Sequence, residues 1–173
     1  MSETSDLSQN ETYIEITNNG KKIEIIYEID KNIEVILLSD NNQSVNVPMK
    51  ILNQIEYFRK IDLKDIDKLP ILEMDFDCFQ KMIEFASYYY INPMQKIELP
   101  VLKNISELVQ PFYSNFVYGD NNVPTKDQVR FLHKMVIQTN MWNFEPLRML
   151  LLAKISTLLR FNPQLLRESL IDN

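Results

Sequence analysis

The chain has few of the residue types from which catalytic and metal centres are most often built. Its 173 residues include one cysteine, Cys78, one histidine, His133, and two glycines, Gly20 and Gly119. A single cysteine excludes both an internal disulfide framework and a cysteine metal cluster, and it favours a reducing compartment. Two isolated glycines exclude a glycine-rich phosphate loop. We therefore expect no cofactor and no metal site.

Clustered positive charge and long apolar runs are also lacking. The net charge is −6, and the basic residues gather on no one face, which argues against a nucleic-acid partner. No apolar run approaches the roughly 20 residues that span a bilayer. The first residues are polar and acidic, unlike a signal or transit peptide. We expect a protein of the cytoplasm and nucleus, with no membrane and no nucleic-acid partner.

The chain does contain enough apolar residues for a core, at 45% of the sequence. Residues 1–11 are polar and predict a disordered lead. Isoleucine then alternates with polar residues on both sides of Asn18-Asn19-Gly20. Because Asn and Gly tolerate positive φ, this pattern predicts an extra β-hairpin within residues 12–32.

Residues 33–124 predict a core in which a small β-sheet packs on helices. Alternating Ile33, Val35 and Leu37 predict a strand, and turn residues at 39–42 lead to a return strand at 44–47. Further elements are predicted as a helix at 48–58, a short strand at 70–74, a helix at 76–90 and a helix from Pro100 that Pro111 kinks or splits. The buried side of the 48–58 helix is predicted to hold Ile51, Leu52, Ile55 and Phe58.

The helix at 76–90 has an N-terminal capping signal and a candidate buried face. Asp75 is placed to cap it, and Cys78 is interpreted as a core residue. The predicted buried face consists of Phe76, Phe79, Ile83, Ala86 and Tyr90.

Residues 125–173 predict three consecutive helices with very short joints. Thr125 or Asp127 begins the first, with Val129, Leu132, Val136 and Ile137 on its buried face. Asn143 is expected to cap the second, and Pro163 begins the third. The middle helix is apolar on nearly every side, so either the rest of the chain or a partner protein must bury it.

Catalytic chemistry has little support in the sequence. A nucleophilic pair of Cys78 and His133 would need an orienting group and an oxyanion site, and neither is visible. Acidic pairs such as Asp75 and Asp77 are interpreted as capping or solvated carboxylates. Trp142, at a helix joint, remains open to two readings, a plug between helices or a binding hot spot under a partner.

The order of the elements resembles the SKP and elongin-C family of ubiquitin-ligase adaptors. The resemblance runs from Ile33 to Asn173, and its clearest segments are I-E-V-I-L-L-S-D-N-N-Q-S-V-N-V, L-P-I-L-E-M-D-F-D-C-F-Q-K-M-I-E-F-A and R-F-L-H-K-M-V-I-Q-T-N-M-W-N-F-E-P-L-R-M-L-L-L. The family's helix joint reads roughly A-N-Y-L-D-I, and only its asparagine is identical in Thr139–Phe144. The first hairpin is additional, the family's acidic insert is replaced, and the family's further C-terminal tail is missing after Asn173.

The resemblance implies an α+β, POZ (BTB)-like fold with additional C-terminal helices at 125–173. It implies a non-enzymatic adaptor of a cullin-type, SCF-like E3 ubiquitin ligase that bridges a cullin-like scaffold to an F-box-like substrate receptor. Asn140 and Met141 would contact the scaffold. The F-box-like partner would be bound by Trp142, Phe144, Leu151, Ile155, Leu158, Leu159, Phe161, Leu165 and Leu166.

Three alternatives remain open at this point. The chain could be an SKP-like structural subunit of a non-ligase assembly such as a kinetochore complex, in which case it would co-purify without a cullin. It could be a POZ oligomerisation module, which would form a homodimer without partners. It could be a small enzyme, which would lose activity on His133→Ala with the fold intact.

Overall fold

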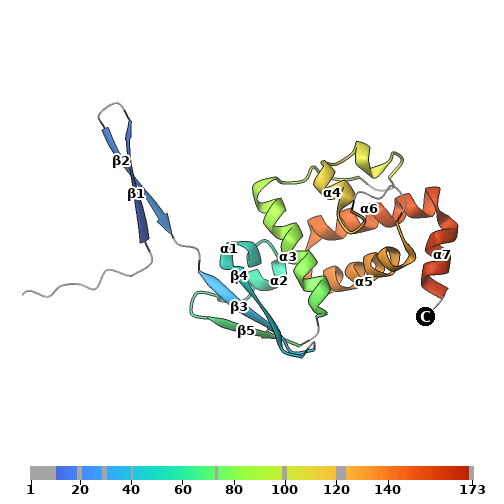
Figure 1. The fold of residues 1–173 in the computed structure, drawn as a ribbon, viewed down its shortest axis with the longest axis horizontal. Coiled ribbons are helices and arrows are strands. Elements are labelled where there is room, and N and C mark those ends of the chain that lie inside the picture. The colour runs from blue at the N-terminus through green and yellow to red at the C-terminus, as the bar shows by residue number, and fades with distance from the viewer. Residues whose placement is uncertain are drawn as a thin grey trace, which may run out of the picture.

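Four of the five strands in the described residues come first along the chain, and helices make up most of its remaining length (Figure 1). A computed structural model describes residues 11–18, 21–28, 31–39, 41–72, 74–98, 101–119 and 124–171. Within these ranges the protein is mixed α+β, with seven α-helices and one 3₁₀-helix. None of these helices is both long and apolar enough to cross a bilayer.

The first sheet is the predicted extra hairpin. Strands β1 (Glu11–Asn18) and β2 (Lys21–Glu28) pair antiparallel, with Asn18 opposite Lys21. This register leaves two residues for the turn, the loop length that an Asn-Gly turn favours. The predicted turn residues 19–20 and residues 1–10 of the lead predicted at 1–11 lie outside the described residues, and Glu11 belongs to β1.

The second sheet has the strand order β4-β3-β5. Strands β3 (Asn32–Leu37) and β4 (Gln43–Pro48) form the predicted second hairpin, and β5 (Lys68–Ile71) runs parallel to β3. In β3 the predicted alternation is confirmed, because Ile33, Val35 and Leu37 are all buried. One face of this sheet therefore packs into the core.

The elements between β4 and α3 differ from the sequence predictions. The single helix predicted at 48–58 is wrong, since a turn separates α1 (Met49–Leu52) from α2 (Glu56–Arg59). The four predicted core residues are nevertheless all buried: Ile51, Leu52, Ile55 and Phe58. Strand β5 begins two residues before the predicted strand, because its pairing with β3 starts at Lys68 opposite Glu34.

Helix α3 (Phe76–Ile91) begins as predicted, and its predicted buried face is confirmed in part. Phe79 and Ala86 are buried, and Phe76 and Ile83 are half-buried against the core. The Asp75 carboxylate accepts a hydrogen bond of 3.1 Å from the Cys78 N–H and forms an ion pair of 2.5 Å with Lys134. Tyr90, predicted to face inward, is exposed. The residues actually buried are Cys78, Phe79, Met82, Phe85 and Ala86. Helical spacing alone did not fix this face, because apolar residues surround most of the helix.

The helix predicted from Pro100 is wrong. Residues 101–104 are irregular, η1 (Ile105–Glu107) is a short 3₁₀-helix, and Pro111 begins α4 (Pro111–Asn115). Proline has no N–H and clashes with a preceding helical turn, so Pro111 is suited to a helix start and not to an interior position.

The three predicted C-terminal helices are confirmed as α5 (Lys126–Trp142), α6 (Glu145–Phe161) and α7 (Pro163–Ile171). Thr125 and Gln128 form a reciprocal capping box at the start of α5. The expectation that Asn143 caps α6 is wrong, because Asn143 ends α5 in the left-handed conformation, with φ of 52°. Helix α6 packs on α5, and α7 packs against both.

Candidate functional site

The α5–α6 hairpin places the most exposed residues of the two predicted binding surfaces at opposite ends of one helix. Helix α6 has 17 residues, and at about 1.5 Å per residue it is about 25 Å long. Asn140 and Met141 lie at the corner that precedes its N-terminus, and Leu159 and Phe161 lie in its last turn. Two partners could therefore bind without competing for the same residues.

Aromatic packing fixes the corner from inside. The ring of Trp142 stacks on Phe58 at a centroid distance of 5.2 Å and meets the edge of Tyr57 at 4.2 Å. The Asn143 side-chain amide donates a hydrogen bond to the Glu56 carboxylate. Trp142 is itself buried, so it supports the corner and offers little surface to a partner. These contacts hold the corner and α2 together as one unit.

The outer side of the corner is partly apolar. Asn140 is exposed, and Met141 is 50% exposed. One turn earlier, Ile137 is also exposed, which corrects its predicted place on the buried face of α5. Tyr57 on α2 is exposed too, and sequence reasoning missed it. Its sequence signal was its place outside the spacing of three and four residues that links Ile51, Ile55 and Phe58.

The structure divides the nine predicted F-box-like contact residues into two groups. Leu159 and Phe161 are 57% and 53% exposed, and Ile155 and Leu165 are half-buried. The other five are buried within the chain itself: Trp142, Phe144, Leu151, Leu158 and Leu166. A buried side chain cannot contact a partner unless the local structure rearranges to expose it. The residues available for direct contact are therefore those of the first group.

Most of the apolar surface of α6 is covered by its own chain. Leu147, Leu150, Leu151 and Leu158 face the core. The half-buried Leu152 and Ile155 and the exposed Leu159 lie on a different side, at helical spacings of three and four residues. We call Leu152, Ile155 and Leu159 the outer face of α6.

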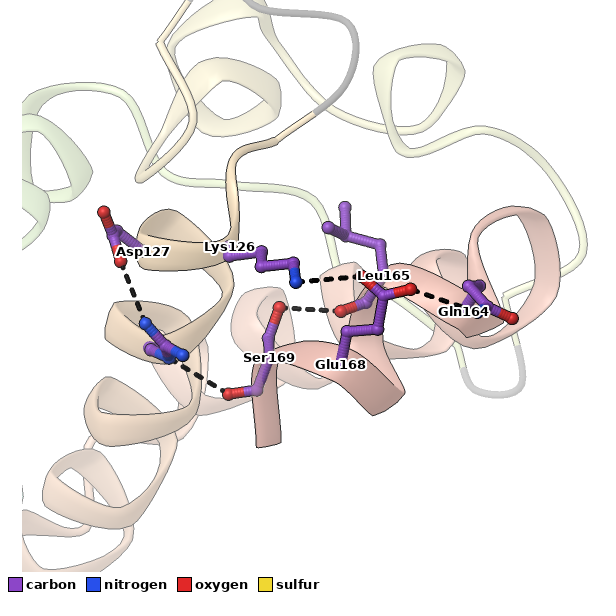
Figure 2. A network of polar contacts seen from close by, with 7 residues as sticks. Lys126, Asp127, Gln164, Leu165, Glu168 and Ser169 are labelled. Atoms are coloured by element: carbon purple, nitrogen blue, oxygen red, sulfur yellow. Dashed lines mark hydrogen bonds and ion pairs between the residues drawn. The ribbon is translucent and has the colours of Figure 1, made fainter. Parts of the chain in front are cut away.

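Polar contacts fix the position of α7 against α5 (Figure 2). Lys126 pairs with Glu168 at 2.9 Å, and Arg130 Nε donates to the carbonyl oxygen of Ser169 at 3.2 Å. Within α7, the buried Ser169 hydroxyl donates to the Leu165 carbonyl at 2.6 Å. Because these bonds lie along the α5 side of α7, they determine where the apolar side chain of Leu165 is presented.

A buried lysine on α6 was missed by the sequence analysis. Lys154 is 1% exposed, its Nζ donates to the Ser114 carbonyl at 2.5 Å, and it lies 4.6 Å from the centroid of the Tyr118 ring. Burial lowers the pKa of Lys154 to about 7. The sequence signal was its position, because Lys154 falls at helical spacing between Leu150 and Leu158 on the buried stripe.

The residues weighed for nucleophilic chemistry have unsuitable surroundings. Cys78 is fully buried, and this burial raises its pKa to about 12, so the thiol stays protonated at neutral pH. His133 lies on an exposed position of α5. Among the described residues, no group of three or more His, Cys, Asp or Glu side chains is arranged to hold a metal ion.

Comparison of this chain with protein-family models and with curated proteins finds no match.

Proposed function

We propose that this chain is a non-enzymatic adaptor of a cullin-type, SCF-like E3 ubiquitin ligase, built on a POZ (BTB)-like fold and acting in the cytoplasm and nucleus. It bridges a cullin-like scaffold to an F-box-like substrate receptor. The observation that supports this proposal best is the presence of two exposed apolar surfaces at opposite ends of α6. The three-stranded sheet with its parallel closing strand is compatible with the expected core.

The scaffold binds at the corner in this proposal. Asn140 and Met141 make the contact, and Ile137 and Tyr57 extend the apolar area around them. The packing of Trp142 beneath the corner keeps these side chains in place before the scaffold arrives. Such preorganisation limits the entropy lost on binding.

The receptor binds at the other end of α6. A helical F-box-like segment would lie along the outer face of α6 and contact Ile155 and Leu159, with Phe161 and Leu165 beside them. Recognition of a helix by an apolar surface relies on anchors at spacings of three, four and seven residues, and Leu152, Ile155 and Leu159 have this spacing. Of the five buried predicted residues, Trp142 lies beneath the corner instead, and the other four belong to the core.

Two charge substitutions test the proposal by separating the surfaces. Met141→Asp should abolish cullin capture and keep the F-box-like partner, and Leu159→Asp should do the reverse. Both positions are at least half exposed, so the fold should survive. A central apolar anchor contributes about 2 kcal/mol or more, so each loss should exceed about tenfold. Leu158 is buried, and a charge there would test folding instead of binding.

The measurement is a pull-down with the full chain followed by mass spectrometry, with circular dichroism to verify folding. Leu72→Asp is the matched control, because Leu72 is 72% exposed and lies outside both surfaces. Recovery of neither a cullin nor an F-box-like protein would refute the proposal. Recovery of the F-box-like protein alone would favour a non-ligase assembly, and a stable homodimer without partners would favour an oligomerisation module.

A further inference from the structure

A cavity of about 230 Å³ lies beside Lys154, between η1, α4 and α6. Its lining comes from some of the residues in the segments 104–106, 114–118 and 154–162, together with Pro124. Asn104, Ser106 and Phe161 are exposed residues of this lining, so the cavity reaches the surface. It shares Phe161 with the proposed receptor surface, but none of its lining residues belongs to the corner or to the outer face of α6.

Two hydrogen-bond donors in the lining have unused capacity. The buried Tyr118 hydroxyl has no partner within the described part of the chain. Lys154 Nζ has three hydrogens, of which one is donated to Ser114 and another can face the Tyr118 ring. The hydroxyls of Ser114 and Thr157 are already engaged, because they donate to helix carbonyl oxygens.

The charge in the cavity is also unbalanced. Lys154 is the only charged side chain among the described residues that line it. Keeping a lysine and an unpaired phenol buried is unfavourable for folding, and an acceptor that enters the cavity would satisfy both groups. Costly buried groups of this kind often mark functional sites.

We propose that this cavity is a binding site for a single carboxylate group. An ionised carboxylate only accepts hydrogen bonds, and its two oxygens can take one from Lys154 Nζ and one from the Tyr118 hydroxyl. Its one negative charge matches the one lysine. A phosphate dianion would place two charges against a single cation. A neutral carbonyl group would leave the charge of Lys154 uncompensated.

The carboxylate has two possible sources. It belongs either to a free small carboxylic acid or to an aspartate or glutamate side chain of a bound protein. Both would enter through the exposed part of the lining beside Phe161. The site itself does not depend on the adaptor proposal, because neither Lys154 nor Tyr118 contributes to either partner surface.

Lysine-selective NMR of the full chain tests the proposal directly. The Lys154 Cε resonance, assigned with Lys154→Met, is followed during titration with acetate at constant ionic strength, and acetamide is the matched neutral control. We expect a saturable shift of this resonance with acetate and none with acetamide. Equal responses to the two probes, or a shift shared by all lysines, would overturn the proposal.

Tyr118→Phe provides the second variant. It removes only the unpartnered hydroxyl, so the melting temperature should stay the same or rise. Acetate affinity should fall by about tenfold, because a hydrogen bond to a charged group is lost. A merely structural tyrosine would not combine unchanged or higher stability with weaker binding. Unchanged acetate affinity in this variant would overturn the assignment of Tyr118.

A last pair of probes separates the two sources. Propionate represents a free acid with a single charge, and N-acetylaspartate methylamide represents a protein side chain. Tighter binding of propionate assigns the cavity to free acids, and tighter binding of the peptide-like probe assigns it to a protein side chain. If neither competes with acetate, both proposed sources of the carboxylate are refuted.

Discussion

Replacement of Lys154 by methionine should make the protein more stable at neutral pH and should remove a specific pH dependence. Methionine has a similar length and no charge, so it can occupy the buried position between Leu150 and Leu158. The reason lies in the burial of Lys154, which lowers its pKa from the ordinary 10.5 to about 7.

The magnitude follows from this pKa difference. At about 1.4 kcal/mol per pKa unit, the fall from 10.5 to about 7 costs the folded state about 5 kcal/mol. The variant also loses the hydrogen bond to Ser114, and this loss reduces the gain in stability by about 2 kcal/mol. Lys154→Met should therefore be more stable than the wild type by about 3 kcal/mol at pH 7.

The sign of the pH dependence is also fixed. Folding depresses the pKa of Lys154, so the cost is complete below pH 7 and disappears as the pH rises towards 10.5. Between pH 7 and about 8.5 the wild type should gain about 1.5 kcal/mol relative to the variant. At higher pH, burial of Cys78 has the opposite effect, because its raised pKa makes the folded state lose stability as the unfolded thiol ionises.

Urea unfolding followed by the fluorescence of the buried Trp142 measures both effects. Wild type and variant are compared at pH 7 and about 8.5 at constant ionic strength. The contribution of Cys78, whose thiol begins to ionise in the unfolded chain near pH 8.5, cancels in this comparison because both proteins contain it. If the difference in unfolding free energy between wild type and variant is the same at both pH values, the reasoning is refuted, because Lys154 would then keep an ordinary pKa in the folded protein.

Two smaller predictions concern helix ends. Thr125→Ala should cost about 1 kcal/mol in urea unfolding, because it removes the capping box of α5, whereas Thr125→Ser should keep most of that stability. Asn143→Ala should also cost about 1 kcal/mol, since alanine resists the left-handed conformation. Asn143→Gly should cost less in the same measurement, and an equal loss for alanine and glycine would instead point to the hydrogen bond with Glu56.

The sequence predicted the elements whose causes are local. Both hairpins are marked by short turns between alternating runs, and pairing follows directly from this pattern. The cap at Asp75 was identified, and Thr125 was one of the two candidates for the start of α5, because a capping side chain and the N–H it accepts from lie within three residues of each other. Local sequence patterns also predicted the α+β composition and the three C-terminal helices.

The candidate surfaces were predicted less well, because they depend on which side of each helix is covered. Apolar residues nearly surround α6, so the spacing could not tell that Leu158 is buried and Leu159 is exposed. The same ambiguity placed Tyr90 and Ile137 on the wrong side of their helices. Trp142 fitted both a core and an interface role until the rings of α2 were found beside it.

The amino-acid sequence by itself determined the two hairpins, the starts of α3, α5 and α7 and the amount of apolar surface, because neighbouring residues set backbone conformation and periodicity. The tertiary structure alone decided where that surface is buried, which brought Lys154 to Tyr118 and left Leu159 exposed. These outcomes depend on contacts between segments far apart in the chain. The physical reason is that burial is a property of packed elements, and no single helix contains the information about what covers it.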